Sequence, residues 1–397
     1  MTSASLFAAR GSLVALTMIV KNEAHVIERC LASVRDLVTS WVVVDTGSTD
    51  GTQDVVRRAM SGIPGDVYDR PWRGFGASRT ESFQLAREQG LAEYALVIDA
   101  DDELVYNGIL RKSLLPRSLS QQLHDHRDVY SLAIHLGDLR FRRSQLFRLA
   151  KPWSYVGVVH EVSRCTEPVT RGTLEGVVYQ CHRDGARSQD PDKYRRDAAL
   201  LEQAMIDEPD NPRNVFYAAQ SWRDAGNDYR ARQLYERRVK MGGAADEVFI
   251  AFFETAKAKH RLGDSAESVI QAYLIASWAR PTRAEPLYEL ARYCRLQKRF
   301  EESWIHAEAA AKIPLPPGDM FVQTSVYTWR ALDELAQAAY WTGRYQVSRE
   351  TSERILREQR FPADQLGRLC ENLEWAMSGP RSGEKRGASL DVDAKEE

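Results

Sequence analysis

Residues 41–52, Trp-Val-Val-Val-Asp-Thr-Gly-Ser-Thr-Asp-Gly-Thr, decide the class of fold. The apolar run at the start is typical of a parallel strand that is covered on both faces. It ends at Asp45, and the glycines and small polar residues that follow are typical of a turn leading into a helix. Ser48 or Thr49 can cap that helix, and Asp50 favours its positive end. The stretch therefore predicts a strand, a turn and a helix in succession.

Comparable apolar runs lie on both sides of this stretch. Residues 13–20 form an earlier run, which is followed by apolar residues at helical spacing over residues 26–38. A later run, residues 95–98, ends in the acidic sequence Asp99-Ala100-Asp101-Asp102. Further strands are predicted at residues 130–135, 144–149 and 173–179. The alternation of strands and helices predicts an α/β domain over residues 12–185.

Helices replace strands in the second half of the chain. From about residue 190, helical segments pair around short turns at residues 225–227, 262–264, 297–299 and 342–344. This period is typical of tetratricopeptide-like repeats, whose helix pairs need neighbours to bury their apolar faces. The repeats are predicted to span residues 190–376, and most of their aromatic residues are assigned to the core between repeats. Residues 379–397 have the composition of a disordered tail.

The overall composition excludes several classes of protein. The chain has 397 residues and a formal net charge of -2, so no strong field attracts nucleic acid or an anionic membrane. Its five cysteines include no Cys-x-x-Cys pair, which disfavours a disulfide framework and a structural zinc site. The longest early apolar run, residues 13–20, is too short to span a bilayer. We therefore expect a cytoplasmic protein without a membrane span, which argues against a polymer-extruding synthase.

The acidic residues Asp99 and Asp101 give the strongest chemical signal. In an open α/β sheet, ligands bind beyond the carboxyl ends of the strands, so both carboxylates are expected to face a binding site. Mg²⁺ and Mn²⁺ bind carboxylate oxygens and can neutralise the charge of a departing nucleotide diphosphate. By position, Asp101 is assigned to the metal, and Asp99 to ribose hydroxyls or to the metal through water. A solvated acidic turn is the alternative.

Three motifs, taken in order, resemble glycosyltransferase family 2. They are Met-Ile-Val-Lys-Asn-Glu at residues 18–23, the stretch at residues 41–52, and Val-Ile-Asp-Ala-Asp-Asp at residues 97–102. The resemblance covers about the first 180 residues and implies the GT-A fold, a Rossmann-like mixed sheet that binds a nucleotide-sugar across its strand ends. The helical half is similar to repeats attached to one soluble branch of that family. The resemblance implies metal-dependent, inverting transfer of a hexose or N-acetylhexosamine, with a UDP-sugar favoured as donor.

The first two motifs carry the family's nucleotide-binding residues. Val20, Asn22 and Glu23 are expected to border the nucleotide base, and Asp45 to hydrogen-bond the uracil or the ribose. For Asp45, the alternative is a turn-forming role before Gly47. For Glu23, the alternative is an acid that the first helical turn favours without any ligand.

Two residues outside these motifs are also carried over from the family. Arg79 resembles the arginine beside the diphosphate and the ribose, and the alternative is an exposed arginine on a helix. His182 ends the last predicted strand, and a histidine downstream of the acidic motif often completes metal coordination in GT-A enzymes. Imidazole suits Mn²⁺ better than Mg²⁺. The alternative for His182 is a cap on the linker to the repeats.

The pair His160-Glu161 is the second chemical cluster, which branches of the family with this arrangement place on the acceptor side. Inverting transfer requires one base that takes a proton from the attacking acceptor, and Glu161 is assigned this role. Asp102, directly after the metal motif, is the reserve candidate. His160 is expected to orient the base or to meet the pyrophosphate, unless it is a buried structural histidine. The family usually carries its base in an acidic pair, so the His-Glu version is a departure.

Arginines and aromatic residues around this pair have two interpretations each. Arg142, Arg143 and Arg148 could contact phosphates, but alternating charges on a strand more often form its solvated face. Trp153 and Tyr155 could stack on a sugar ring, although packing in an aromatic core is favoured.

Two other functional classes are compatible with parts of the sequence. A nucleotidyltransferase would carry a Gly-rich loop with Lys or Arg after the first strand, whereas residues 21–24 are Lys-Asn-Glu-Ala. A non-catalytic scaffold with a relic transferase domain is disfavoured by the intact pair Asp99 and Asp101. The repeats suit a peptide or protein acceptor, or self-association as a homodimer, and a saccharide acceptor is also compatible with the sequence.

Overall fold

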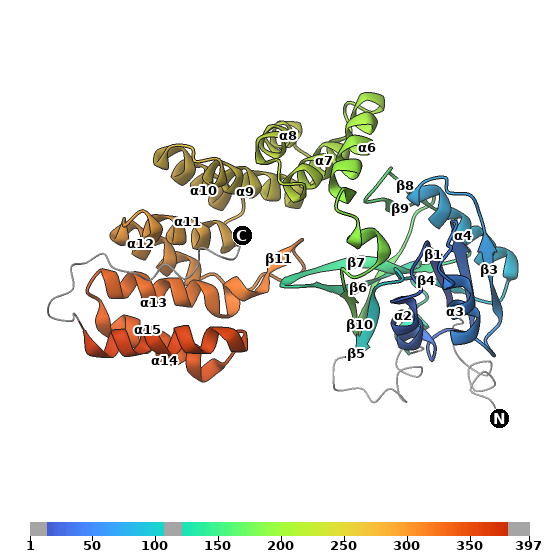
Figure 1. The fold of residues 1–397 in the computed structure, drawn as a ribbon, viewed down its shortest axis with the longest axis horizontal. Coiled ribbons are helices and arrows are strands. Elements are labelled where there is room, and N and C mark those ends of the chain that lie inside the picture. Colours follow the sequence, from blue (N-terminus) through green and yellow to red (C-terminus); the bar gives the residue numbers. More distant parts are fainter. Residues whose placement is uncertain (1–13, 107–120, 380–397) are drawn as a thin grey trace. The chain divides into compact units, whose positions relative to one another are not determined.

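The computed structural model describes residues 14–106 and 121–379 (Figure 1). They fall into two compact units, each considered by itself. The first unit comprises the residues up to 264 together with 317–322, and the second comprises residues 265–316 and those from 323 onward. The first unit contains the large sheet and the first repeat helices, and the second contains the remaining helices.

A mixed sheet forms the centre of the first unit. Its strands are β1 (Val14–Val20), β2 (Ser40–Asp45), β3 (Gly65–Asp69), β4 (Tyr94–Val97), β5 (Glu103–Tyr106), β6 (Val129–Leu136), β7 (Leu139–Arg148) and β10 (Arg171–Cys181). They run in the order β3-β2-β1-β4-β7-β6-β10-β5. The strands β3, β2, β1 and β4 are parallel, whereas β7 is antiparallel to both of its neighbours. A separate antiparallel ribbon is formed by β8 (Trp153–Val156) and β9 (Val162–Cys165).

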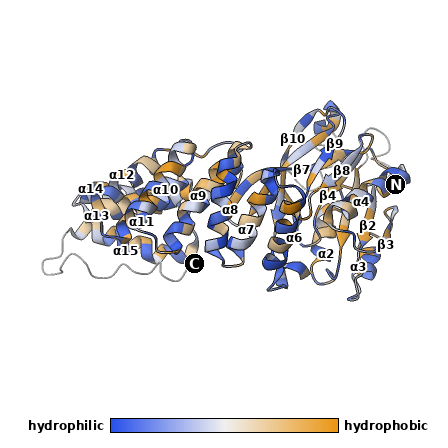
Figure 2. Ribbon diagram, turned by 90° about the horizontal axis from the view of Figure 1, so that it is seen from above, coloured by the Kyte–Doolittle hydropathy of each residue, from blue (hydrophilic) through white to orange (hydrophobic). Residues whose placement is uncertain are grey.

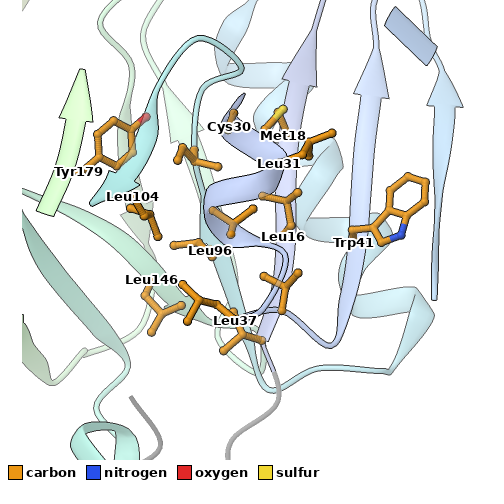
Figure 3. Packing of buried hydrophobic residues seen from close by; sticks show 14 of the residues in the cluster. Leu16, Met18, Cys30, Leu31, Leu37, Trp41, Leu96, Leu104, Leu146 and Tyr179 are labelled. Atoms are coloured by element: carbon orange, nitrogen blue, oxygen red, sulfur yellow. The ribbon is translucent and has the colours of Figure 1, made fainter. Parts of the chain in front are cut away.

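Helices cover both faces of the parallel part of the sheet. Side chains of β1 alternate between two cores, with Leu16 in one and Ala15 in the other. Ile27 and Val56 share the core of Leu16, which Figure 3 shows in part, whereas Phe83 packs in the core of Ala15. Both faces of β1 are therefore buried, as its continuous apolar sequence predicts. The helices that carry these residues are α2 (Ile27–Val34), α3 (Thr52–Ala59) and α4 (Phe75–Gln89).

The remaining helices follow one another along the chain, and most neighbours in sequence pack against each other within each unit. The first unit contains α6 (Lys193–Asp207), α7 (Pro212–Asp224), α8 (Asp228–Met241) and α9 (Ala245–Arg261). The second unit contains α10 (Ala266–Ala279), α11 (Glu285–Leu296), α12 (Phe300–Ala311), α13 (Ala331–Trp341), α14 (Tyr345–Glu358) and α15 (Leu366–Ser378). Short elements are β11 (Val322–Gln323), a π-helical turn (Val326–Arg330) and 3₁₀ turns (Leu123–Asp125, Ala186–Gln189, Ala363–Gln365).

The repeat helices carry both hydrophobic and hydrophilic residues, as expected for helices that are buried on one side (Figure 2). The four predicted turns at residues 225–227, 262–264, 297–299 and 342–344 each lie between two consecutive helices. At the first of them, the Asn227 side chain accepts a hydrogen bond from the backbone N–H of Arg230 and so caps α8.

The predicted fold class, an α/β part with a mixed sheet followed by all-α helix pairs, is confirmed. The proposed boundaries of the domains, 12–185 and 190–376, stay a prediction. Helices α6 to α9 belong to the same compact unit as the sheet. The predicted tail at residues 379–397 lies, except for its first residue, outside the described residues. Across residues 14–106 and 121–379, no helix is both long and apolar enough to cross a bilayer.

Candidate active site

The edge where β1, β2 and β4 end gathers the predicted nucleotide-binding residues. Val20 and Asp45 are directly paired at the ends of β1 and β2. Asp45 is fully buried, and its Oδ1 accepts hydrogen bonds from the backbone N–H groups of Gly47 (2.9 Å) and Ser48 (2.7 Å). Its Oδ2 is buried without a hydrogen-bond partner in the described structure. A buried acceptor left unpaired is costly, so Oδ2 is suited to a donor group of a ligand.

The loops that follow β1 and β2 are tied to each other. Asn22 donates its backbone N–H to the Ser48 hydroxyl (2.9 Å), and its Oδ1 accepts from the Thr49 backbone N–H (2.8 Å). The predicted capping of α3 by Ser48 or Thr49 is wrong, because Gly51 occupies the N-cap position of this helix. The Asp50 carboxylate instead accepts from the backbone N–H groups of Thr52 and Ala24, both at 3.0 Å. These bonds fix the backbone beside Asp45.

Glu23 precedes α2 and contacts the segment that follows β10. Its Oε2 accepts a hydrogen bond from the backbone N–H of Ala186 at 3.1 Å. Burial is the main reason that the pKa of Glu23 is raised to about 7. The interpretation of Glu23 as a plain first-turn acid is wrong, because α2 begins at Ile27.

Arg79 joins the two predicted chemical clusters. It lies on α4, its Nη2 is 2.5 Å from Asp99 Oδ1, and its Nε donates to Glu161 Oε1. Its side chain is only 13% exposed, which excludes the alternative interpretation of Arg79 as an exposed arginine on a helix. Burial would raise the pKa of Asp99, but the positive charges of Arg79 and Arg143 outweigh it and hold that pKa below its usual value. Asp99 and the predicted base Glu161 therefore share one guanidinium.

The next two carboxylates lack such compensation. Burial, followed by the charge of Asp99, raises the pKa of Asp101. The same effects raise the pKa of Asp102 to about 7, although its Oδ1 accepts from the His182 backbone N–H (2.9 Å). Gly185 packs directly on Asp101, since a Cβ at Gly185 would lie 2.8 Å from Asp101 Oδ2. Carboxylates whose ionised form is disfavoured by burial and by a neighbouring negative charge would be relieved by a divalent cation, so these residues are compatible with the expected Mn²⁺ or Mg²⁺.

The structure does not bring the whole predicted metal set together. His182 Nε2 lies 3.2 Å from Glu103 Oε1, and the carboxylate of Asp99 is paired with Arg79. Within the described ranges, no group of three His, Cys, Asp or Glu side chains has an arrangement that could hold a metal ion. The trio of Asp99, Asp101 and His182 is thus not a preassembled ligand set, and the metal site stays a prediction that rests on Asp101.

His160 is held by a repeat helix, a contact that the sequence analysis missed. Its ring stacks on Tyr217 of α7, with ring centroids 4.2 Å apart and planes 13° apart. Its carbonyl accepts a hydrogen bond from Arg213 Nη2 at 3.0 Å. The residue is exposed overall, but the packed neighbours desolvate the ring and lower the pKa of His160 to about 4. Tyr217 carried no distinguishing signal, because an aromatic residue at helical spacing also fits the core between repeats.

The neighbouring basic strand has a mixed outcome. Arg142 pairs with Glu175 in an exposed contact, and Arg148 lies near Glu93 at 3.5 Å, so neither belongs to the site. Arg143 lies over the ring of Tyr179 at 4.9 Å and is one of the cations that lower the pKa of Asp99. Trp153 and Tyr155 both pack against Phe147, which confirms the predicted role of these two residues in an aromatic core.

We expect the stability of the Asp102→Asn variant to depend less on pH than that of the wild type. A carboxyl whose pKa rises from 3.8 to about 7 on folding holds a proton that the unfolded chain releases, so its contribution to the free energy of unfolding falls as pH rises between those values. In denaturant unfolding without divalent metal, the free energy of unfolding of the variant should therefore rise relative to that of the wild type between pH 5 and pH 8. Asp54→Asn on the exposed face of α3 should keep the wild-type slope, and equal slopes for all three proteins would contradict the shift.

Comparison with known proteins agrees with this geometry. Residues 16–111 match the model of glycosyl transferase family 2. The chain is 25% identical over 208 residues to the SPbeta prophage-derived glycosyltransferase SunS of Bacillus subtilis, which covers 50% of this chain and 47% of that protein. It is 35% identical over 100 residues to the lipopolysaccharide core biosynthesis glycosyltransferase LpsC of Rhizobium meliloti, covering 25% of this chain and 34% of LpsC.

Two further proteins are similar to parts of the chain. A TPR repeat-containing protein of Synechococcus elongatus is 38% identical over 96 residues, which is 23% of this chain and 21% of that protein. Among solved structures, S. aureus TarS 1-349 in complex with UDP-GlcNAc aligns with a TM-score of 0.37 at 12% identity, covering 64% of this chain and 93% of that chain. The chain spans less than half the length of each of these curated relatives. Residues 16–111 of its α/β part are thus similar to glycosyl transferase family 2, and helix pairs like those of tetratricopeptide repeats follow this part.

Proposed function

We propose that this protein is a metal-dependent, inverting glycosyltransferase that uses a nucleotide-sugar, with a uridine diphosphate donor favoured. One observation carries the proposal: within the residues similar to glycosyl transferase family 2, Asp45, Asp99 and Asp101 lie at or directly beyond the carboxyl ends of β2 and β4, on the two sides of β1. In an open α/β sheet this edge is where ligands bind. A hexose or N-acetylhexosamine is the proposed sugar, and a peptide, protein or saccharide is the proposed acceptor.

Each carboxylate has a distinct role in this proposal. The unpaired Oδ2 of Asp45 accepts a hydrogen bond from the base or the ribose. Asp101 would hold Mn²⁺ or Mg²⁺ with help from the bound diphosphate, and the cation would supply positive charge for the departing nucleotide. Asp99, which pairs with Arg79, would accept hydrogen bonds from the ribose or from water on the cation.

Glu161 is the proposed base. Arg79 holds its Oε1, while the structure gives no hydrogen-bond partner to its Oε2 among the described residues. Oε2 can therefore take the proton from an acceptor hydroxyl or similar nucleophile as it attacks the anomeric carbon. Asp102 is less suited, because it is only 5% exposed and its Oδ1 already accepts from the His182 backbone.

A screen of donor hydrolysis tests the proposal directly. Purified full-length protein is incubated with UDP-, GDP- and CMP-linked sugars, with Mn²⁺, with Mg²⁺ or with EDTA, and release of the nucleotide is measured. We expect slow hydrolysis of one uridine donor, and only in the presence of metal. Undiminished hydrolysis in EDTA would refute the metal dependence, and release of pyrophosphate from UTP and a sugar phosphate would indicate a nucleotidyltransferase instead.

A further inference from the structure

Helix α7 of the repeats makes two separate contacts with the residue next to the proposed base. The Tyr217 ring lies parallel to the His160 ring at 4.2 Å, and Arg213 donates to the His160 carbonyl at 3.0 Å. Arg213 also lies over the Tyr217 ring at 4.6 Å, so the two residues of α7 support each other. Together they hold both the side chain and the backbone of His160.

The backbone of His160 needs such support. Its φ of 51° is in the left-handed region, which residues other than glycine rarely adopt. A conformation of this kind is strained and persists only where surrounding contacts fix it. Since Glu161 is the next residue, the direction of its side chain depends on this backbone conformation. On the side of the repeat helices, this backbone conformation is supported by the contacts with α7.

Arg213 is itself held by charged residues from the two following helices. Its Nη1 lies 3.4 Å from Oε1 of Glu247 on α9, and Oε2 of Glu247 lies 2.9 Å from Nη2 of Arg238 on α8. Arg238 is completely buried, and the Glu247 side chain is 8% exposed. Buried charges are costly unless each is paired, and breaking such a group is strongly destabilising. This Arg-Glu-Arg group therefore fixes the position of Arg213 through three successive helices.

We propose that Arg213 and Tyr217 are positioning residues of the transferase site, which they reach through His160 and Glu161. The first repeat helices are on this view part of the catalytic machinery, in addition to any role in binding an acceptor. The inference rests on the proposed function, because it concerns the placement of the proposed base. Neither residue touches the reacting atoms, so removing either should lower kcat and leave the binding of the donor nearly unchanged.

The test compares Arg213→Met with Arg213→Lys and Arg230→Met in the full chain. Lysine can still donate to the His160 carbonyl, whereas methionine cannot. Arg230 is a matched control, because it also makes an ion pair between repeat helices, with Glu202 at 2.8 Å, but makes none of the contacts with His160. Hydrolysis of UDP-N-acetylglucosamine and UDP-glucose with Mn²⁺ is measured, together with hydrogen–deuterium exchange of residues 157–162. Tyr217→Leu and Tyr217→Phe form a second pair, in which only phenylalanine keeps the ring stack.

We expect Arg213→Met to lower kcat about 10-fold to 10²-fold with the donor KM changed less than about threefold, and to speed exchange in residues 157–162. Arg213→Lys should recover part of the lost kcat, and kcat should be higher in Tyr217→Phe than in Tyr217→Leu. Equal losses in Arg213→Met and Arg230→Met, or exchange that stays at the wild-type rate in Arg213→Met, would overturn the inference. A wild-type protein that hydrolyses neither donor would count against the proposed function, and exchange alone would then decide whether α7 holds the loop.

Discussion

Asp101→Asn is expected to lower metal-dependent turnover of the nucleotide-sugar by at least about 10²-fold, the order of loss seen when one group that stabilises transition-state charge is removed. The amide keeps the size of the side chain but lacks the negative charge that attracts a divalent cation. Binding of Mn²⁺ measured by electron paramagnetic resonance in the presence of UDP should weaken in parallel. Both effects follow from the assignment of Asp101 to the metal.

A measurement of stability shows whether the loss of turnover in Asp101→Asn comes from misfolding. Burial and the charge of Asp99 raise the pKa of Asp101, so the ionised carboxylate is disfavoured in the folded protein and a neutral amide relieves that cost. The melting temperature of Asp101→Asn in EDTA should therefore equal or exceed that of the wild type. Asp54→Asn, an exposed change on α3, should alter neither turnover nor melting. Wild-type turnover by Asp101→Asn would remove Asp101 from the mechanism.

Arg79→Met is expected to be the most destabilising single substitution in the site. It leaves Asp99 and Glu161, whose side chains are 34% and 11% exposed, without their shared cation. Removing one partner of a buried charge group typically costs about 3–5 kcal/mol of unfolding free energy. Urea unfolding at pH 7 should show a loss near the lower end of this range, because solvent screens the partly exposed Asp99.

The loss should shrink in acid. Arg79 contributes to holding the pKa of Asp99 below its usual value, so the stabilisation from this pair is present above the pKa of the unfolded chain and disappears as pH falls and Asp99 is protonated. The gap between wild type and Arg79→Met should therefore be smaller at pH 3 than at pH 7. Arg57→Met is the control, since Arg57 makes an exposed pair with Asp54 at 3.6 Å. A pH-independent gap, or equal losses in both variants, would contradict the role given to Arg79.

The part of the fold that sequence could predict is the part that is buried on both faces. β1, β2 and β4 are continuous apolar runs because helices cover both of their sides, and their ends could be placed to within about a residue. β3 was missed because it is a short edge strand, Gly65–Asp69, in which only Val67 is buried. The ribbon of β8 and β9 was missed for a related reason, since β9 (Val162–Cys165) has no fully buried residue.

The candidate site divides in the same way. Asp45, Asp99 and Asp101 were predictable because they directly follow strands whose carboxyl ends meet at one edge of the sheet. The pairing of His182 with Glu103 was not, because it depends on how β10 and β5 align as antiparallel neighbours. The contact between Tyr217 and His160 depends on how a repeat helix packs on a distant loop, which periodicity within α7 cannot reveal.

The unpaired Oδ2 of Asp45 has a consequence for which nucleotide base the site would accept. If Asp45 makes the proposed contact with the base, its unpaired oxygen, as a hydrogen-bond acceptor, would favour a heterocycle that presents an N–H over one that presents a lone pair. Uracil offers an imide N–H, whereas the ring nitrogen of cytosine at the same place is a bare acceptor. Rejection of cytidylyl donors would then arise from repulsion between two acceptors facing each other, without any steric barrier.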